Sequence, residues 1–245
     1  MIRQSVINCI IITAFITAMS SCQLGSHNAI FGNGNVTIEN RTISSFTKLH
    51  LDGAFKTIIS QDGGPAWVKV ETDQNLQQAV KVSNEGETLE IANKSEINFN
   101  KPTKMVVYVN VKELSSLNNA SVGKVETKGP IKTDVFDLNI DAVGKTSLEI
   151  QVRKLTATIN SVGIVALAGS AVTADIDNNS VGKLEAYGLK TDTLNIKNNS
   201  VGAVEVYAEK EISIDHNGVG SLHYKGPAAM KNLTDNGVGK ASKAD

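Results

Sequence analysis

Two glutamates and two tyrosines occupy matching places in consecutive copies of one motif. Glu185 and Tyr187 lie in the stretch NNSVGKLEAYG, and Glu205 and Tyr207 lie twenty residues later in NNSVGAVEVYA. Paired carboxylates are the groups with which glycosidases act on sugars, and stacked outward tyrosines form a platform for a sugar ring or a partner protein. These four residues are the candidate binding residues of the chain.

The same residues also have an ordinary structural interpretation, which the sequence leaves open. Glu126, in an earlier copy, points outward at the same level, so the carboxylates can form a hydrated face that keeps the protein in solution. A cross-strand tyrosine pair stabilises a sheet by about 0.2–1 kcal/mol without binding a ligand. Tyr224, in the next copy, is shifted by one position.

The histidines predict neither a metal site nor a catalytic site. His216 and His223 flank one corner of the repeat, with Asp215 beside them, but zinc sites usually need three or four ligands at set spacing. The sequence shows no Cys-His, Ser-His-Asp or glycine-rich phosphate motif in a credible setting. We therefore expect no catalytic residue, no metal and no cofactor.

A valine-glycine pair recurs seven times at intervals of 18 to 21 residues. So regular an interval indicates a solenoid, in which each repeat forms one coil. Glycine adopts backbone angles that a side chain forbids, so we interpret the pair as a tight turn repeated at each level. The turn glycines are Gly123, Gly144, Gly163, Gly182, Gly202, Gly220 and Gly239.

Small and amide side chains precede each of these valines. The residue before the valine is Ser, Ala or Gly in every copy, and the residue two before it is Asn in five copies of seven. Asn tolerates the left-handed backbone region, and stacked Asn side chains hydrogen-bond to one another. The sequence therefore predicts a ladder at the corner, made of Asn160, Asn179, Asn199, Asn217 and Asn236.

Apolar and polar residues alternate on both sides of each corner. Leu184 and Ala186 follow one corner, and Leu194 and Ile196 precede the next. A period of two indicates strands rather than helices, and a repeat of about 19 extended residues suits one coil of roughly 65 Å perimeter. The predicted fold class is all-β: a right-handed β-helix, or β-solenoid, with coils of about 19 residues.

Two parts of the chain depart from the clean repeat. The second copy, VGKTSLEIQV, shifts its alternation, so we expect a β-bulge that turns Leu148 and Ile150 inward. Residues 35–115 carry alternating strands separated by turn signals such as DGGP. The segment DGAF, residues 52–55, has the features of a degenerate corner. If it is one, a single β-structure extends through both regions.

Composition and charge exclude two broad classes of protein. Hydrophobic residues make up 41% of the 245 residues, which is enough for a packed core and excludes a disordered chain. Lys and Arg number 24 against 25 Asp and Glu, so the chain has no basic field for a phosphate backbone. We expect no nucleic-acid partner.

The first residues resemble an export signal. Arg3 precedes the apolar run VINCIIITAFITAM, which is too short to cross a hydrocarbon core of about 30 Å, and SSC follows it. This order is typical of a bacterial lipoprotein signal with Cys22 as the lipidated residue; an ordinary cleaved secretory signal is the alternative. The predicted segments are a signal peptide (1–21), the lipidated Cys22 with a flexible tether (22–34), an N-terminal β region (35–115) and the repeat region (116–245), with the last two continuous.

Two long stretches resemble a known family. The run FTKLHLDGAFKTIISQDGGPAWVKVETDQNLQQAVKVSNEGETLEI and the later VYVNVKELSSLNNASVGKVE are similar to the putative auto-transporter adhesin, head GIN domain family. The resemblance covers about residues 35–240. It implies a bacterial envelope protein with a right-handed β-helix-like fold and an adhesin role, and it implies no catalytic residue.

These observations predict a non-enzymatic, lipid-anchored cell-envelope protein whose repetitive face binds a glycan or an envelope protein. The alternatives are a carbohydrate-active β-helix enzyme that uses Glu185 and Glu205, and a structural or signalling accessory of the periplasm. We expect the lipid anchor to hold the protein at the outer membrane, facing the periplasm rather than the surface, because the tether has no acidic pair. An open solenoid end would also allow a dimer.

Overall fold

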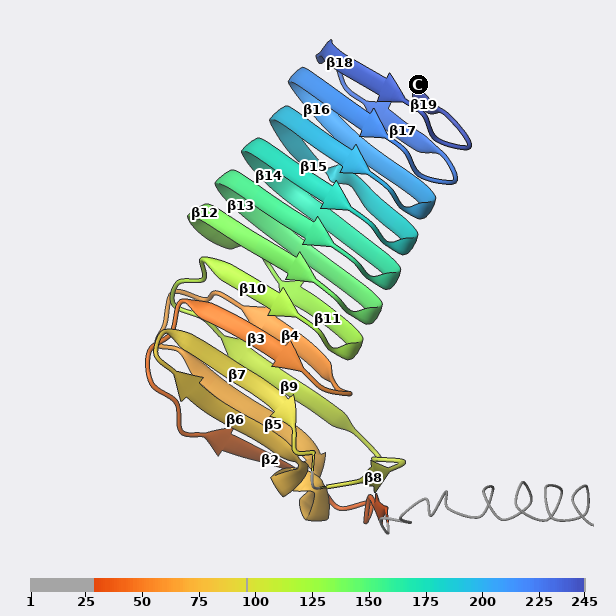
Figure 1. Ribbon diagram of the computed structural model, residues 1–245. Coiled ribbons are helices and arrows are strands. Elements are labelled where there is room, and N and C mark those ends of the chain that lie inside the picture. The colour runs from red at the N-terminus through yellow and green to blue at the C-terminus, as the bar shows by residue number, and fades with distance from the viewer. Residues whose placement is uncertain (1–28, 96, 245) are drawn as a thin grey trace, which may run out of the picture.

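The computed structural model describes residues 29–95 and 97–244 as a tall stack of β-coils (Figure 1). The coils wind into a β-solenoid of about seven turns with about 19 residues each, and nearly all of its strands belong to one sheet. The predicted all-β solenoid is confirmed. Cys22, the predicted signal peptide and most of the predicted tether lie outside the described residues.

The strands fall into an irregular N-terminal set and a regular C-terminal set. The first set comprises β1 (Ile30–Phe31), β2 (Val36–Arg41), β3 (Lys48–Asp52), β4 (Lys56–Ser60), β5 (Trp67–Asp73), the short 3-10 helix η1 (Gln74–Ala79), β6 (Val80–Glu85), β7 (Thr88–Asn93), β8 (Phe99–Asn100) and β9 (Met105–Asn110). The second comprises β10 (Ser116–Asn119), β11 (Val122–Lys128), β12 (Ile131–Ile140), β13 (Val143–Ile159), β14 (Val162–Asn178), β15 (Val181–Asn198), β16 (Val201–His216), β17 (Leu222–Lys225), β18 (Ala229–Asp235) and β19 (Ala241–Lys243).

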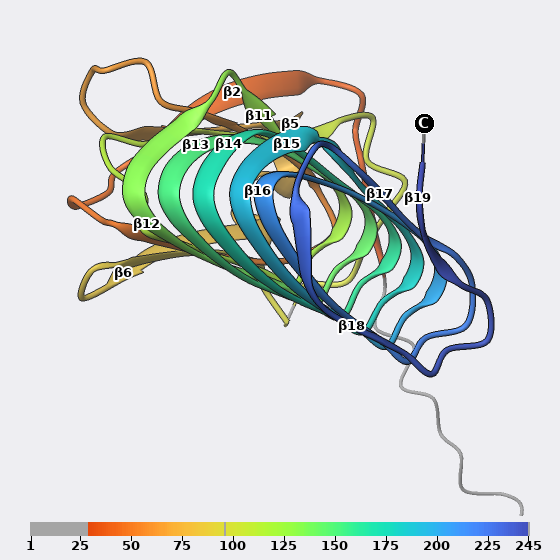
Figure 2. The same ribbon diagram turned by 90° about the horizontal axis from the view of Figure 1, so that it is seen from above.

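The valine-glycine corners stack directly above one another. The valines from Val122 to Val201 are paired residue by residue along the parallel strands β11 and β13 to β16, and Val219 and Val238 continue the column through isolated bridges. Figure 2 looks down the stack and shows the coils β13 to β16 following one another around a common outline. The repeat in the sequence is therefore the coil of the structure.

Each coil has two walls that enclose the core. The first wall is the strand segment that follows a Val-Gly corner, and the second wall is the segment that precedes the next corner. Inward side chains of successive coils stand in register about 4.8 Å apart, and burying each large one contributes about 1.5–3 kcal/mol. One inward column of the second wall consists of Leu89, Leu49, Leu117, Leu138, Ala157, Ile176, Ile196 and Ile214.

The second repeat copy keeps its register, so the bulge expected there is wrong. Residues from Val143 to Val152 pair with β14 without a shift. On the first wall, Thr146 takes the inward position that Val125 and Val165 hold in the neighbouring coils, and it is buried. Its hydroxyl accepts a hydrogen bond from Asn119 Nδ2 at 2.9 Å, which satisfies the polar group inside the core. Leu148 and Ile150 point inward without a bulge, and the register shift falls instead one coil later, between Ala166 and Ala168.

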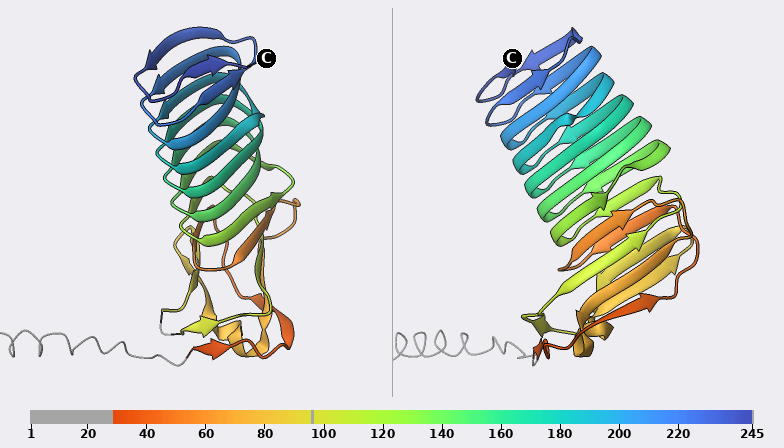
Figure 3. Two further views of the ribbon diagram at one scale, coloured as in Figure 1. Left: turned by 90° about the vertical axis from the view of Figure 1, so that its right-hand side faces the viewer. Right: turned by 180° about the vertical axis from the view of Figure 1, so that it is seen from behind.

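The corner at residues 52–55 stacks beneath the first Val-Gly corner, as the sequence suggested. Ala54 bridges to Val122, and strands β3 and β4 pair in parallel with β10 and β11. On their other side β3 and β4 pair with β7 and β9, so this coil lies between two segments that follow it in the sequence. Figure 3 shows the N-terminal strands continuing the coil stack at its lower end.

The two ends of the stack are closed differently. At the N-terminal end, antiparallel pairs of β2 with β5 and of β6 with β7 replace the coil pattern, and η1 buries Leu76. At the C-terminal end, Leu233 continues the inward column above Ile214 but remains 46% exposed. Among the residues the structure describes, there is no helix long and apolar enough to cross a membrane.

Candidate functional site

The seven turn glycines line one edge of the solenoid. Each has a positive φ between 115° and 137°, a region that L side chains rarely adopt. A Cβ atom on Gly182 would also collide with the carbonyl oxygen of Gly163 in the coil below, and the same holds for the higher corners. The valines beside them are about half exposed. The glycines therefore serve close stacking of the coils rather than chemistry.

The predicted Asn side chains form an exposed ladder along these corners. Asn160 donates to Asp141, Asn179 to Asn160 and Asn199 to Asn179, over N···O distances of 2.7, 3.3 and 2.8 Å. Asn236 donates to Asn217 at 3.2 Å. The ladder breaks once, because Asn217 donates to Asp215 of its own coil instead of to Asn199.

A second, buried ladder runs beside the exposed one, and the sequence interpretation missed it. Asn178 donates through Nδ2 to Asn198 Oδ1 at 2.8 Å, and Asn198 Nδ2 lies 2.9 Å from His216 Nδ1. Ser180 and Ser200 donate to the Asn Oδ1 atoms of their own coils. Both asparagines and His216 are at most 1% exposed. The doubled Asn in NNSVG was the available signal, since the alternation turns one of the pair inward.

His216 is the last member of the buried ladder, and its ring lies beside Gly237. Because Asn198 Nδ2 is a donor, His216 Nδ1 accepts and the proton resides on Nε2. That Nε2 atom has no hydrogen-bond partner among the described residues. Gly237 leaves room for the ring, since a Cβ there would lie 2.7 Å from Nε2. His223, the histidine on the other side of this corner, has its Nδ1 atom 3.0 Å from the Ser242 hydroxyl.

The candidate glutamates lie in one outward column of the first wall. Glu185 and Glu205 are direct partners in register, and Lys183 Nζ lies 3.2 Å from one carboxylate and 3.0 Å from the other. The hydrogen bonds that Lys183 donates to Glu205 and Glu185 raise the pKa of Lys183. The lysine thus offsets the repulsion between the two carboxylates, which is what a stabilised charged face requires.

Glu126 occupies the same column at a distance from the other two. Two coils, with Ser147 and Ala166 in this position, separate it from Glu185. Lys124 and Lys56 form ion pairs with Glu126, and their hydrogen bonds hold its pKa below the ordinary value. No group of three or more His, Cys, Asp or Glu residues that could hold a metal occurs within 29–95 and 97–244.

The two candidate tyrosines are each covered by a lysine. Lys190 Nζ lies 3.4 Å from the centroid of the Tyr207 ring, and Lys225 Nζ lies 5.2 Å from that of Tyr187. Tyr207 also donates its hydroxyl to Glu209 at 2.7 Å, which raises the pKa of that phenol. Cation–π contacts of this kind stabilise a surface. Each lysine lies over one face of its ring.

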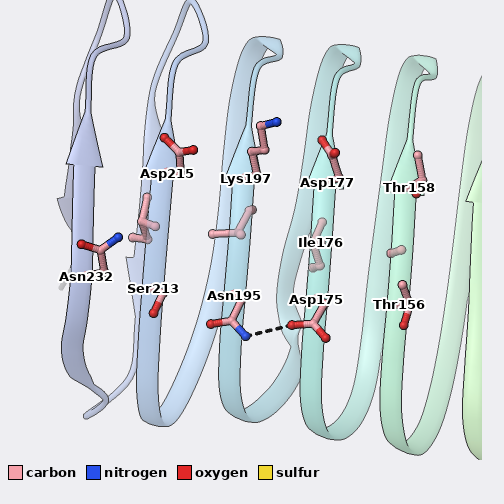
Figure 4. A pocket seen from close by; sticks show the side chains of 13 residues that line it. Thr156, Thr158, Asp175, Ile176, Asp177, Asn195, Lys197, Ser213, Asp215 and Asn232 are labelled. Carbon is pink, nitrogen blue, oxygen red and sulfur yellow. Dashed lines mark hydrogen bonds between the residues drawn. The ribbon is translucent and has the colours of Figure 1, made fainter.

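A shallow depression crosses the second wall and gathers a different set of residues. It has a volume of about 360 Å³ and spans β13 to β16 and β18. Figure 4 shows two rows of short polar side chains running from coil to coil. One row contains Thr156, Asp175, Asn195, Ser213 and Asn232, and the other contains Thr158, Asp177, Lys197 and Asp215.

The outward side chains of this groove suit polar contacts with an extended ligand, and the groove is also lined by Ala157, Ile176, Ile196 and Ile214. Three aspartates accompany one lysine, and the remaining outward groups are hydroxyls and amides. Asn195 donates to Asp175 at 2.8 Å across neighbouring coils, which fixes both side chains (Figure 4). Donors and acceptors therefore recur at the coil spacing of about 4.8 Å along a straight wall.

Comparison with known proteins places this architecture in a family. A family model described as putative auto-transporter adhesin, head GIN domain, matches residues 45–228. A search of the curated proteins found no match. Among solved structures, a putative adhesin from Bacteroides fragilis has a TM-score of 0.83 at 23% identity, and the alignment covers 88% of this chain and 100% of that one.

Two further solved structures share the fold. A putative adhesin from Parabacteroides merdae has a TM-score of 0.66 at 22% identity, covering 89% of this chain and 99% of that one. A putative lipid binding protein from Parabacteroides distasonis has a TM-score of 0.69 at 22% identity, covering 89% and 100%. The family model covers well over half of the sequence, and its match agrees with the resemblance found in the residues themselves. The chain belongs to the putative auto-transporter adhesin, head GIN domain family.

Proposed function

We propose that the protein is a lipid-anchored adhesin-like protein of the cell envelope that holds an extended glycan along the second wall, without a catalytic role. Its family and two of the three solved structures described above carry adhesin descriptions, which support a role in the envelope and in binding. The observation that carries the proposal is the groove of Figure 4, where two rows of short hydroxyl, amide and carboxylate groups repeat across successive coils. Such rows match a polymer whose hydroxyls also repeat.

The groove is favoured over the sequence-predicted residues of the first wall. Glu185 and Glu205 share Lys183, so a ligand could reach these carboxylates only by displacing their ion pairs. By contrast, the polar groove side chains other than Lys197 are short, and none of the groove residues forms an ion pair within the described part of the chain (Figure 4). A ligand can reach them without displacing an ion pair.

Filling the groove with one bulky side chain tests this function. Ser213→Phe places a ring among the outward groups of the groove, and Ser147→Phe places the same ring on the first wall as a matched control. We expect Ser213→Phe to weaken binding of the full chain on an array of purified glycans by more than about tenfold. Equal signals for both variants, or no bound glycan for the unsubstituted protein, would contradict the proposal.

The anchor is tested separately through Cys22. We propose that this cysteine carries the lipid and holds the solenoid at the outer membrane, on its periplasmic side. Incorporation of radioactive palmitate should be lost in Cys22→Ala and unaffected in Ser147→Phe. A Cys22→Ala protein that still incorporates the label would reject the anchor and leave the groove proposal untouched.

A further inference from the structure

A second pocket lies in the N-terminal region, away from the groove. It has a volume of about 400 Å³ and opens where the ends of β4, β5, β9 and β11 meet. These strands come together because β4 pairs in parallel with both β9 and β11, while β5 pairs antiparallel with β9. Its lining residues are Ile58, Ser60, Gln61, Asp62, Trp67, Tyr108 and Lys128.

The floor of this pocket is aromatic and held in place. Trp67 pairs with Asn110 and Tyr108 with Lys69, so the two rings are diagonal neighbours on one face. Tyr108 donates its hydroxyl to Glu71 at 2.7 Å, and Lys69 Nζ lies 4.8 Å from the centroid of the Trp67 ring. Two partly exposed aromatic rings beside one cavity stand out in a chain with 4% aromatic residues.

A buried amide fixes the loop that forms one side of the pocket. Asn110 is fully buried and donates from Nδ2 to Asp62 Oδ1 at 2.7 Å and to the Pro65 carbonyl at 2.9 Å. Its Oδ1 accepts from the Ser60 hydroxyl at 3.0 Å. Gln61 binds the backbone of Lys132, accepting from its N–H at 2.6 Å. The loop is therefore preorganised before any ligand arrives.

Two charged groups at the pocket remain available to a ligand. Both hydrogen bonds to the Asp62 carboxylate fall on Oδ1, which leaves Oδ2 without a partner among the described residues. Lys128, which is exposed and pairs in register with Ser60, forms no ion pair within the described part of the chain. One free acceptor and one free donor of opposite charge favour a neutral ligand rich in hydroxyls over an ion.

We propose that this pocket binds one pyranose ring of a glycan, stacked on Trp67 and Tyr108 and hydrogen-bonded through its hydroxyls to Asp62 and Lys128. Sugar rings present an apolar face of C–H groups to an aromatic ring and hydroxyls at their edge, and the pocket supplies a partner for each. The proposal rests on the proposed glycan-binding function and adds to it a subsite that grips a single sugar residue.

The chain supplies its own reporter for the test. Trp67 is its sole tryptophan, so tryptophan emission of the full chain reports this pocket alone. Titration with methyl glycopyranosides of glucose, galactose, mannose and N-acetylglucosamine should shift that emission for at least one sugar, with a Kd of about 1 mM. Glycine betaine, a zwitterion that carries a quaternary ammonium group and no hydroxyl, serves as a comparison ligand and should leave the emission unchanged.

Two variants test whether Asp62 and Lys128, here called the rim of the pocket, hold the sugar. Asp62→Asn replaces the free acceptor by a donor of equal size, and Lys128→Gln removes the ammonium. Each should lower the affinity for the sugar, measured from the emission shift, about tenfold. Lys154→Gln, an exposed lysine of the repeat region far from this pocket, is the matched control and should leave the affinity unchanged. Trp67→Phe keeps a ring, and calorimetry should then show binding weakened about fivefold.

The outcomes separate this pocket from the groove. Loss of binding in Asp62→Asn and Lys128→Gln, with Lys154→Gln unaffected, supports the subsite. An emission unchanged by every sugar, or a shift that the rim variants leave intact, overturns it, as does a response to betaine alone. If Ser213→Phe abolishes binding to long glycans while the monosaccharide shift persists, the groove and the pocket are both supported as separate sites. If polymer binding survives Ser213→Phe, the groove fails independently of the pocket.

Discussion

The repeat coils and the N-terminal region enclose one continuous core, but they hold it by different means. From β11 to β16 every coil repeats the same backbone corner in parallel register, and each glycine corner rests on the carbonyl of the one below. In the N-terminal region the pairing turns partly antiparallel. There, buried polar side chains such as Asn110 and Gln77 tie loops to strands.

This difference predicts which substitutions destabilise each region most. In a solenoid, stability is close to a sum of terms between neighbouring coils, so one altered corner disturbs the contacts above and below it. In the N-terminal region, specific side-chain hydrogen bonds add to the buried apolar core, and its turn glycines Gly63 and Gly86 face open space. Identical backbone geometry supports one region, and individual polar contacts support the other.

The largest effect is expected from adding one methyl group at a repeat corner. Gly182→Ala forces a side chain into positive φ and against the Gly163 carbonyl, which should cost about 3 kcal/mol or more. Gly63→Ala, also at positive φ but with nothing within 4 Å, should cost only about 1 kcal/mol. Urea unfolding followed by circular dichroism measures both.

The same experiment sharpens the comparison between regions. Tryptophan emission reports the N-terminal region through Trp67, whereas circular dichroism reports mainly the coils. Gly182→Ala should lower the midpoint of the dichroism transition more than that of the emission transition. Equal destabilisation by Gly182→Ala and Gly63→Ala would show that close stacking of the corners does not distinguish the repeat region.

A smaller effect is expected inside the repeat, where two adjacent asparagines differ in burial. Asn198→Ala leaves three buried partners unsatisfied, namely Asn178 Nδ2, the Ser200 hydroxyl and His216 Nδ1, and should cost about 2 kcal/mol. Asn199→Ala removes a hydrogen bond from the exposed ladder and should cost about 0.5 kcal/mol. Thermal unfolding of the two variants measures the difference in stability. Similar losses of stability would mean that the buried ladder stabilises the protein no more than the exposed one.

These asparagines show how far the sequence could predict the structure. The Val-Gly interval specified the coil length and the stacked corner, because a turn that needs positive φ must recur wherever the coil closes. The interpretation placed the ladder at Asn199 and overlooked Asn198, because a polar side chain was not expected at an inward position of the core. Thr146 was missed for the same reason, since its buried hydroxyl depends on Asn119.

The candidate sites were harder to predict, for two physical reasons. The outward side chains of the groove, such as Asn195 and Ser213, neighbour the inward Ile196 and Ile214 in the sequence, so their direction followed from the alternation. The alternation does not predict that they surround a hollow. The pocket at Trp67 was not foreseeable, because it requires β4 to lie between β9 and β11. Nothing local in the sequence specifies that the chain returns to the other side of its own earlier coil.

The smallest expected effect concerns an ion pair of the N-terminal region and its dependence on pH. Glu71 accepts hydrogen bonds from Lys104 and Tyr108, each at 2.7 Å, and these hold its pKa below the ordinary value of 4.5. A carboxyl group with a lowered pKa in the folded state stabilises it above the unfolded pKa, and the stabilisation is lost as pH falls through the folded pKa. Glu71→Gln should therefore cost up to about 1 kcal/mol at neutral pH.

Below the lowered pKa of Glu71 the cost should vanish, because the carboxyl group is then protonated in both states. Glu149→Gln, which removes the same charge from an exposed position of the repeat region with no ion pair among the described residues, should differ little from the unsubstituted protein at either pH. Urea midpoints at about pH 7 and at successively lower pH, followed by Trp67 emission, give the comparison. If the Glu71→Gln penalty persisted unchanged in acid, the side chain would support the N-terminal strands by packing rather than by its charge. Specific polar contacts would then not distinguish the N-terminal region from the glycine-stacked coils.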